Sequence, residues 1–124
     1  MSRILVRVAH ALIIMLIAAA SVAQGYPVRP IRIIVPFAPG APDTLARILG
    51  QQLGAQMGQS VIVENRPGAN GLIGADLVAK APADGYTILL TSTSYAVNPS
   101  TYKKMPFDPV RDLLPVINTC GIEA

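Results

Sequence analysis

The chain has 124 residues, which is enough for one domain at most. Its formal net charge is +3, but Arg3 and Arg7 lie near the start, and the remainder carries eight basic residues against seven acidic ones. A nearly neutral remainder with no basic run and no aromatic stripe does not indicate nucleic-acid binding. Cys120 is the only cysteine, which excludes an internal disulfide, a CxxC pair and a cysteine metal cluster.

The first 23 residues have the pattern of a secretory signal. A basic start is followed by an unbroken apolar run over residues 11–20, and Ser21 and Ala23 supply the small residues at positions −3 and −1 of a cleavage site. A membrane anchor is the alternative, but the run is shorter than the roughly 20 residues that a spanning helix needs. We therefore expect a signal peptide over residues 1–23, removed after Ala23.

The next stretch reads as a strand, a stiff loop and a helix. Residues 31–35 are β-branched and almost wholly apolar, as in a strand buried on both faces. Three prolines in residues 36–42 interrupt both ladder and helix, and Asp43 stands where an N-cap is expected. Helical spacing of apolar residues continues to Met57, and Gly58 suits the C′ position. Such a corner directs backbone N–H groups at one point and suits an anion; an ordinary strand-helix connection is the alternative.

Two further strands and one helix follow. We expect strands over residues 60–65 and 86–90, and between them a loop over 66–71, a helix over 72–79 and a turn over 81–85. Connections of this length predict parallel pairing with right-handed crossovers, hence an α/β fold. If the strand order is 2-1-3, the loop over 36–42 faces the loop over 91–99 at the carboxyl edge of the sheet, where ligands bind in such folds.

The loop over residues 91–99 is rich in hydroxyl groups, which suit small polar ligands. The alternative is a loop whose hydroxyls cap its own backbone. Beyond it, Asp108 and Pro109 predict a capped turn that runs through Leu113. Val116 and Ile117 then begin a strand-like segment. The lysine pair at 103–104 reads as a solvated patch.

Several kinds of chemistry have no residues to support them. His10 is the only histidine and lies in the signal, so the mature chain lacks the base of Ser-His-Asp and Cys-His systems and the commonest metal ligand. No GxxxxGK[ST] phosphate loop occurs, and the glycines of residues 68–74 do not have dinucleotide-binding spacing. The acidic residues are scattered through expected caps, turns and helix faces. Binding is therefore favoured over catalysis, and we expect neither a cofactor nor a metal ion.

Several short motifs, in order from about residue 30 to residue 117, together resemble the Bug family, the periplasmic substrate-binding proteins of tripartite tricarboxylate transporters. The motifs are IIVPFAPG at 33–40, DTLAR at 43–47, VENRPGA at 63–69, DGYT at 84–87, NP at 98–99, YKK at 102–104, DP at 108–109 and PV at 115–116.

The resemblance implies a two-lobed, type II periplasmic binding protein-like fold that closes over a small carboxylate. By that match the ligand would be lined by Phe37, Ala38, Pro39, Gly40, Ala41, Asp43, Thr93, Ser94, Ala96 and Asn98. Asp43 would act through a bridging water, since a bare carboxylate would repel an anion. The partners implied are a tricarboxylate, dicarboxylate or related organic acid and the membrane components of the transporter. We expect a periplasmic monomer that binds no nucleic acid.

Members of this family are more than twice as long as this chain. The resemblance therefore implies that residues 24–124 are the N-terminal part of the first lobe of a truncated receptor, and residues 118–124 no longer match the family. Two alternatives stay open from the sequence. One is an exported α/β enzyme whose catalytic residues lie in the missing part, and the other is a fragment without function of its own.

Overall fold

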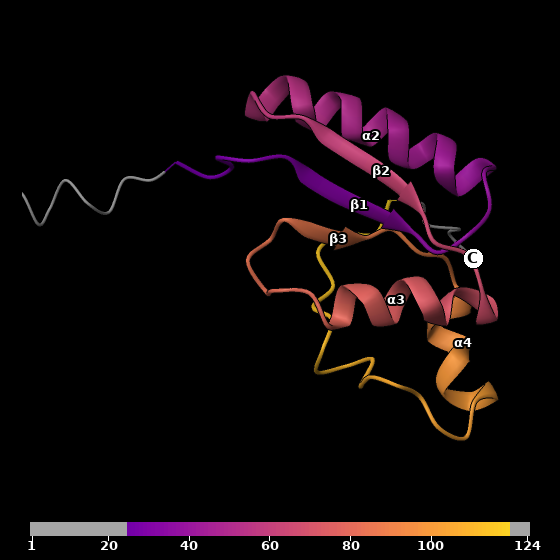
Figure 1. Ribbon diagram of the computed structural model, residues 1–124. Helices are drawn as coiled ribbons and strands as arrows, with labels where there is room; N and C mark the ends of the chain where they lie inside the picture. Colours follow the sequence, from indigo (N-terminus) through magenta and orange to yellow (C-terminus); the bar gives the residue numbers. More distant parts are fainter. Residues whose placement is uncertain (1–24, 120–124) are drawn as a thin grey trace, which may run out of the picture.

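The computed structural model describes residues 25–119, so the expected signal peptide, His10 and Cys120 lie outside the described residues. Three parallel strands form one sheet in the order β2-β1-β3 (Figure 1). They are β1 (Ile31–Val35), β2 (Val61–Asn65) and β3 (Thr87–Leu89). In the register of the sheet, Ile33 of β1 lies between Val63 and Ile88. The parallel pairing expected from the sequence is confirmed, and the strand order is 2-1-3, the case considered in the sequence analysis.

Helix α2 (Ala41–Met57) covers one face of the sheet (Figure 1). Its core contact is between Ala46 and the strand residues Ile33 and Val35, all of which are buried. Gly50 lies so close to β2 that a Cβ there would be 3.2 Å from Val61 Cγ1. Glycine thus lets the helix approach the strand closely. Gly58 ends the helix in the left-handed conformation, and its N–H donates to the carbonyl of Gly54.

The opposite face is covered by α3 (Leu72–Ala79), beside which lies α4 (Ser94–Thr101) (Figure 1). Leu72 and Ala75 of α3 form a second buried cluster with Phe107, against which Tyr95 and Leu89 pack. At Gly74 the helix lies close to Pro36, directly after β1, where a Cβ would be 2.7 Å from Pro36 Cβ. Within residues 25–119, no helix has the length and apolar character needed to cross a membrane.

Three expectations about local structure are wrong. Helix α2 begins three residues earlier than expected, because the first helical turn needs no N–H from Pro42; Gly40 is the N-cap and Asp43 lies inside that turn. The expected loop over residues 91–99 contains most of α4, including Pro99. Val116 and Ile117 belong to no strand and are more than three-quarters exposed. The expected turn after Asp108 is confirmed, since Asp108 Oδ1 accepts the N–H groups of Val110 and Arg111.

The N-terminal segment, residues 26–29, is bonded to residues 84–86, the turn that leads into β3. Tyr26 donates its hydroxyl to the carbonyl of Gly85 at 2.7 Å, and the N–H of Val28 donates to Tyr86 Oη at 2.9 Å. Arg29 forms an ion pair with Asp84 at 2.6 Å, with its guanidinium carbon 4.2 Å from the centre of the Tyr86 ring. These contacts lie at the amino edge of the sheet, so they leave the carboxyl edge open.

Candidate functional site

Three connecting segments meet at the carboxyl edge of the sheet, at the ends of the strand arrows in Figure 1. They are residues 36–40 after β1, residues 66–71 after β2 and residues 90–93 after β3. This edge is where ligands bind in open α/β sheets, because connections diverge there and leave a crevice. The first and third segments are the two loops expected from the sequence to face a ligand.

The segment after β1 presents an open helix N-terminus. Residues 38–41 are exposed, Phe37 is half-buried, and the side-chain amide of Asn65 donates to the carbonyl of Phe37 at 3.1 Å. Gly40 is extended, with φ 170°, and a Cβ there would meet only the carbonyl oxygen of Ala38 at 3.9 Å. No side chain caps the first turn of α2. The backbone N–H groups of Ala41 and Asp43 therefore lack the side-chain partner that commonly satisfies this position.

Asp43 is buried beside this N-terminus and paired with an arginine. Arg47 donates from Nε to Oδ2 at 2.9 Å and from Nη2 to Oδ1 at 3.0 Å, which is a bidentate pair. Hydrogen bonding from Arg47 lowers the pKa of Asp43, with a smaller contribution from Asn65 in the same direction. Asp43 is thus ionised, and its charge is offset by a neighbour that the sequence analysis did not assign to it. A second anion can approach a neutralised carboxylate at a lower electrostatic cost than a bare one.

The segment after β3 leads into α4. Thr93 is the N-cap and is exposed, as is Ala96, whereas Ser94 is half-buried. Ser92 and Ser94 lie with their hydroxyl oxygens 3.1 Å apart, and the N–H of Ser94 is 3.4 Å from Ser92 Oγ. These two hydroxyls are therefore partly used within the segment, which agrees with the self-capping alternative. Thr93 and Ala96 remain accessible at the start of the helix.

Asn98 lies away from this open surface. Its side chain is buried with 2% relative exposure, accepts from Asn70 Nδ2 at 2.8 Å and donates to the carbonyl of Asn70 at 3.1 Å. Neither Asn70 nor the segment after β2 was expected from the sequence to have a role at the site. The signal for it was the cluster PGANG, whose residue types favour turns with positive φ.

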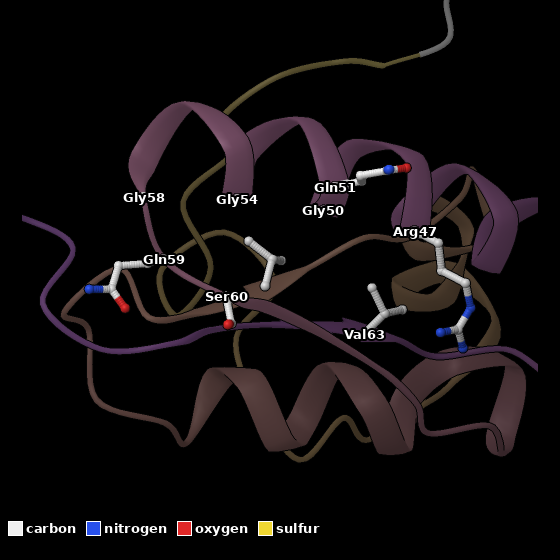
Figure 2. A pocket seen from close by; sticks show the side chains of 9 residues that line it. Arg47, Gly50, Gln51, Gly54, Gly58, Gln59, Ser60 and Val63 are labelled. Carbon is white, nitrogen blue, oxygen red and sulfur yellow. The ribbon is translucent and has the colours of Figure 1, made fainter.

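A groove elsewhere on the molecule contains none of the expected site residues. It lies between α2 and the exposed edge of β2 and has a volume of about 640 Å³ (Figure 2). Gly50 and Gly54 of the helix and Val61 and Val63 of the strand line it, and Arg47 stands at one end. Glycines of α2 face the strand along this groove and leave it open. Because none of the expected ligand-lining residues lies in it, we do not assign the groove to the site. Residues 25–119 contain no group of three or more His, Cys, Asp or Glu side chains arranged to hold a metal ion.

Comparison with known proteins identifies the family. Residues 45–123 match the profile of the tripartite tricarboxylate transporter family receptor, TctC, so the expectation that residues 118–124 no longer match the family is wrong for residues 118–123. The chain belongs to this family. BugT of Bordetella pertussis is 50% identical over 103 residues, which cover 81% of this chain and 32% of BugT. The periplasmic binding protein BugD superposes with a TM-score of 0.66 at 42% identity, covering 70% of this chain and 29% of BugD.

A further solved structure, R. palustris Rpa4515 with adipate, superposes with a TM-score of 0.65 at 38% identity, covering 68% of this chain and 29% of that protein. The chain thus spans about a third of the length of the relatives that it matches. The expected α/β fold, a periplasmic binding protein-like lobe that begins βαβαβ, is confirmed by these superpositions.

Proposed function

We propose that this TctC-family chain is part of a periplasmic receptor that binds a small carboxylate and delivers it to a tripartite tricarboxylate transporter. In this proposal residues 1–23 are a signal peptide, and residues 24–124 form the N-terminal part of the first of two lobes. The receptor is a monomer and not an enzyme. Its ligand is lined by the residues named from the sequence other than the buried Asn98, with Asp43 acting through a bridging water.

One observation supports this proposal above the others. The uncapped N-terminus of α2 opens beside a carboxylate that Arg47 has already neutralised. Backbone N–H groups at a helix N-terminus attract an anion through the helix dipole. Exposed residues 38–41 leave room for that anion, and Thr93 and Ala96 stand across the carboxyl edge. Adipate, the ligand of Rpa4515, is a small dicarboxylate of the expected class.

The test uses a chimera, because the chain spans only about a third of its relatives. In this adipate chimera, residues 25–119 of the chain replace the matching segment of Rpa4515. We expect the adipate chimera to bind adipate in titration calorimetry. Gly40→Val should weaken binding about tenfold or more, since a branched side chain obstructs the approach of a carboxylate to the backbone.

Lys103→Ala is the matched control, because Lys103 is exposed and lies outside the carboxyl edge. Gly40 has extended backbone and open space around it, so valine there should leave the unfolding temperature nearly unchanged. Equal losses of affinity in the two variants would contradict the proposed site. Absence of adipate binding in the unmodified adipate chimera would contradict the proposed function itself.

A further inference from the structure

The segment after β2 has an unusual backbone. Four consecutive residues have positive φ, namely Gly68 (133°), Ala69 (48°), Asn70 (52°) and Gly71 (90°). Glycine adopts such angles freely and asparagine tolerates them, but alanine does so at a cost. A run of this kind persists only where surrounding contacts determine it. The contacts made by residues 68–71 therefore indicate the structural role of this segment.

Those contacts reach both ligand-facing segments. On one side, a Cβ at Gly71 would lie 3.5 Å from Pro36 and 3.7 Å from Phe37, so the turn packs against the segment after β1. On the other side, Asn70 exchanges two hydrogen bonds with Asn98 of α4. The turn is thus a bridge between the loop that starts α2 and the helix that follows β3.

The Asn70–Asn98 pair is specific in its chemistry. Asn98 is almost wholly buried, so its amide must find partners inside the protein. Asn70 supplies a donor from its side chain and an acceptor from its backbone, and the two Asn98 groups match them. Only the first of these bonds needs the side chain at position 70. Glycine at position 70 would keep the left-handed backbone and remove that donor alone.

We infer that Asn70 is a positioning residue, which holds α4 at the distance from the loop over residues 36–40 that a carboxylate ligand requires. The inference rests on the proposed function and adds to it a residue outside the ligand-lining set. Asn70 acts through Asn98, so the buried amide at position 98 serves the site by anchoring α4. Loss of the Asn70 side chain leaves Asn98 Oδ1 buried without its donor and frees α4 to shift.

The experiment measures Asn70→Gly in two ways. In the adipate chimera, we expect adipate affinity to fall about tenfold, as loss of a donor to a buried acceptor predicts. In the full 124-residue chain, hydrogen exchange followed by mass spectrometry should become faster in α4 and stay unchanged in α2. The double variant Asn70→Gly with Asn98→Ala should bind no more weakly than Asn98→Ala alone, because the two residues act as one unit.

Val78→Ala is the control for a purely structural effect. Val78 is buried in α3. Its truncation should lower the unfolding temperature and leave adipate affinity unchanged within about twofold. Unchanged affinity in Asn70→Gly, or unchanged exchange in α4, would overturn the inference. So would a loss of affinity in Val78→Ala equal to that in Asn70→Gly. If the unmodified adipate chimera fails to bind, the proposed function fails, and the inference that rests on it falls with it.

Discussion

The Glu64 side chain on β2 links this strand to β1 through an ion pair. It accepts from Arg32 Nε at 2.7 Å and Arg32 Nη2 at 3.1 Å on β1, and from Arg66 Nη2 at 3.0 Å. Hydrogen bonds from Arg32 and then Arg66 lower the pKa of Glu64 from 4.5 to about 2. A carboxyl whose pKa is lowered on folding stabilises the protein above its unfolded pKa, and that contribution is lost as the pH falls through the folded pKa.

Glu64→Gln should therefore lower the free energy of unfolding at neutral pH by about 1 kcal/mol, a value expected for a partly exposed network. The difference from the unmodified chain should shrink as the pH falls from about 4.5 towards 2, where the native carboxylate itself takes up a proton. Urea unfolding of both proteins across this pH range measures the effect. A difference that stays constant with pH would show that the charge of Glu64 is not responsible.

Residue roles were only partly predictable from the sequence. The position of Asp43 beside the loop followed from its place after three prolines, but its pairing with Arg47 was not assigned. An N-cap and an internal residue of the first turn differ by a shift of a few residues, and prolines are tolerated in both arrangements. The exchange between Asn70 and Asn98 spans 28 residues, so it depends on tertiary distance that local pattern does not contain.

At the level of elements, close approach of helices to the sheet depends on glycines with different surroundings. At Gly50 the nearest atom to an added Cβ is the side-chain Val61 Cγ1 at 3.2 Å, which can shift. At Gly74 the added Cβ would lie 2.7 Å from Pro36 Cβ and 3.0 Å from the carbonyl oxygen of Arg66. A proline ring and a backbone carbonyl cannot give way so easily. Replacing glycine by alanine therefore tests the contact of α2 with β2 at position 50 and the contact of α3 with Pro36 at position 74.

Gly74→Ala should destabilise the chain by about 1–3 kcal/mol through overpacking, despite a gain in helix propensity of about 1 kcal/mol. Gly50→Ala is the matched variant and should stay within about 1 kcal/mol of the unmodified chain, because the propensity gain offsets a small shift of Val61. Thermal unfolding of the two variants side by side decides the point. A larger loss in Gly50→Ala than in Gly74→Ala would contradict this account of the packing.

Elements with a strong local apolar pattern were predicted well from the sequence, and elements with a weak one were not. Strand β1 and helix α2 carry long, regular apolar patterns, and both were predicted within three residues. Helix α4 has hydroxyl residues at its start and Pro99 inside it, so local propensity argues against it. Tertiary contacts outweigh that propensity, since Tyr95 packs on the cluster around Phe107 and Asn98 binds Asn70.

Residues 25–119 supply one side of the proposed ligand site. Val110, Leu114, Val116 and Ile117 are all at least 80% exposed, and no strand of residues 25–119 pairs with the outer edge of β3. A site that excludes water strengthens each hydrogen bond to an anion, and a site open on one side does not. Parallel pairing and a site at the carboxyl edge of the sheet could be predicted, because crossover handedness restricts topology so strongly, whereas α4 within the expected loop over residues 91–99 could not.

We therefore expect the 124-residue chain alone to bind adipate with at best about millimolar affinity. The adipate chimera, which restores the rest of the receptor, should bind far more tightly. Calorimetry under identical conditions compares the two. Micromolar binding by the chain alone would show that one lobe suffices and that the surrounding segments serve another purpose.

The central place of β1 sets an order of events in time. Both of its neighbours, β2 and β3, follow it in the chain, and its last bond to the β3 side is donated by Leu90 to Ile34. During synthesis the N-terminal residues emerge first. The most apolar strand therefore waits, unpaired on one edge, until some 55 further residues have appeared. The sheet can therefore form in two steps: β2 can pair with β1 once residue 65 is present, whereas the β3 edge of β1 and the Arg29–Asp84 ion pair need residues 84–90.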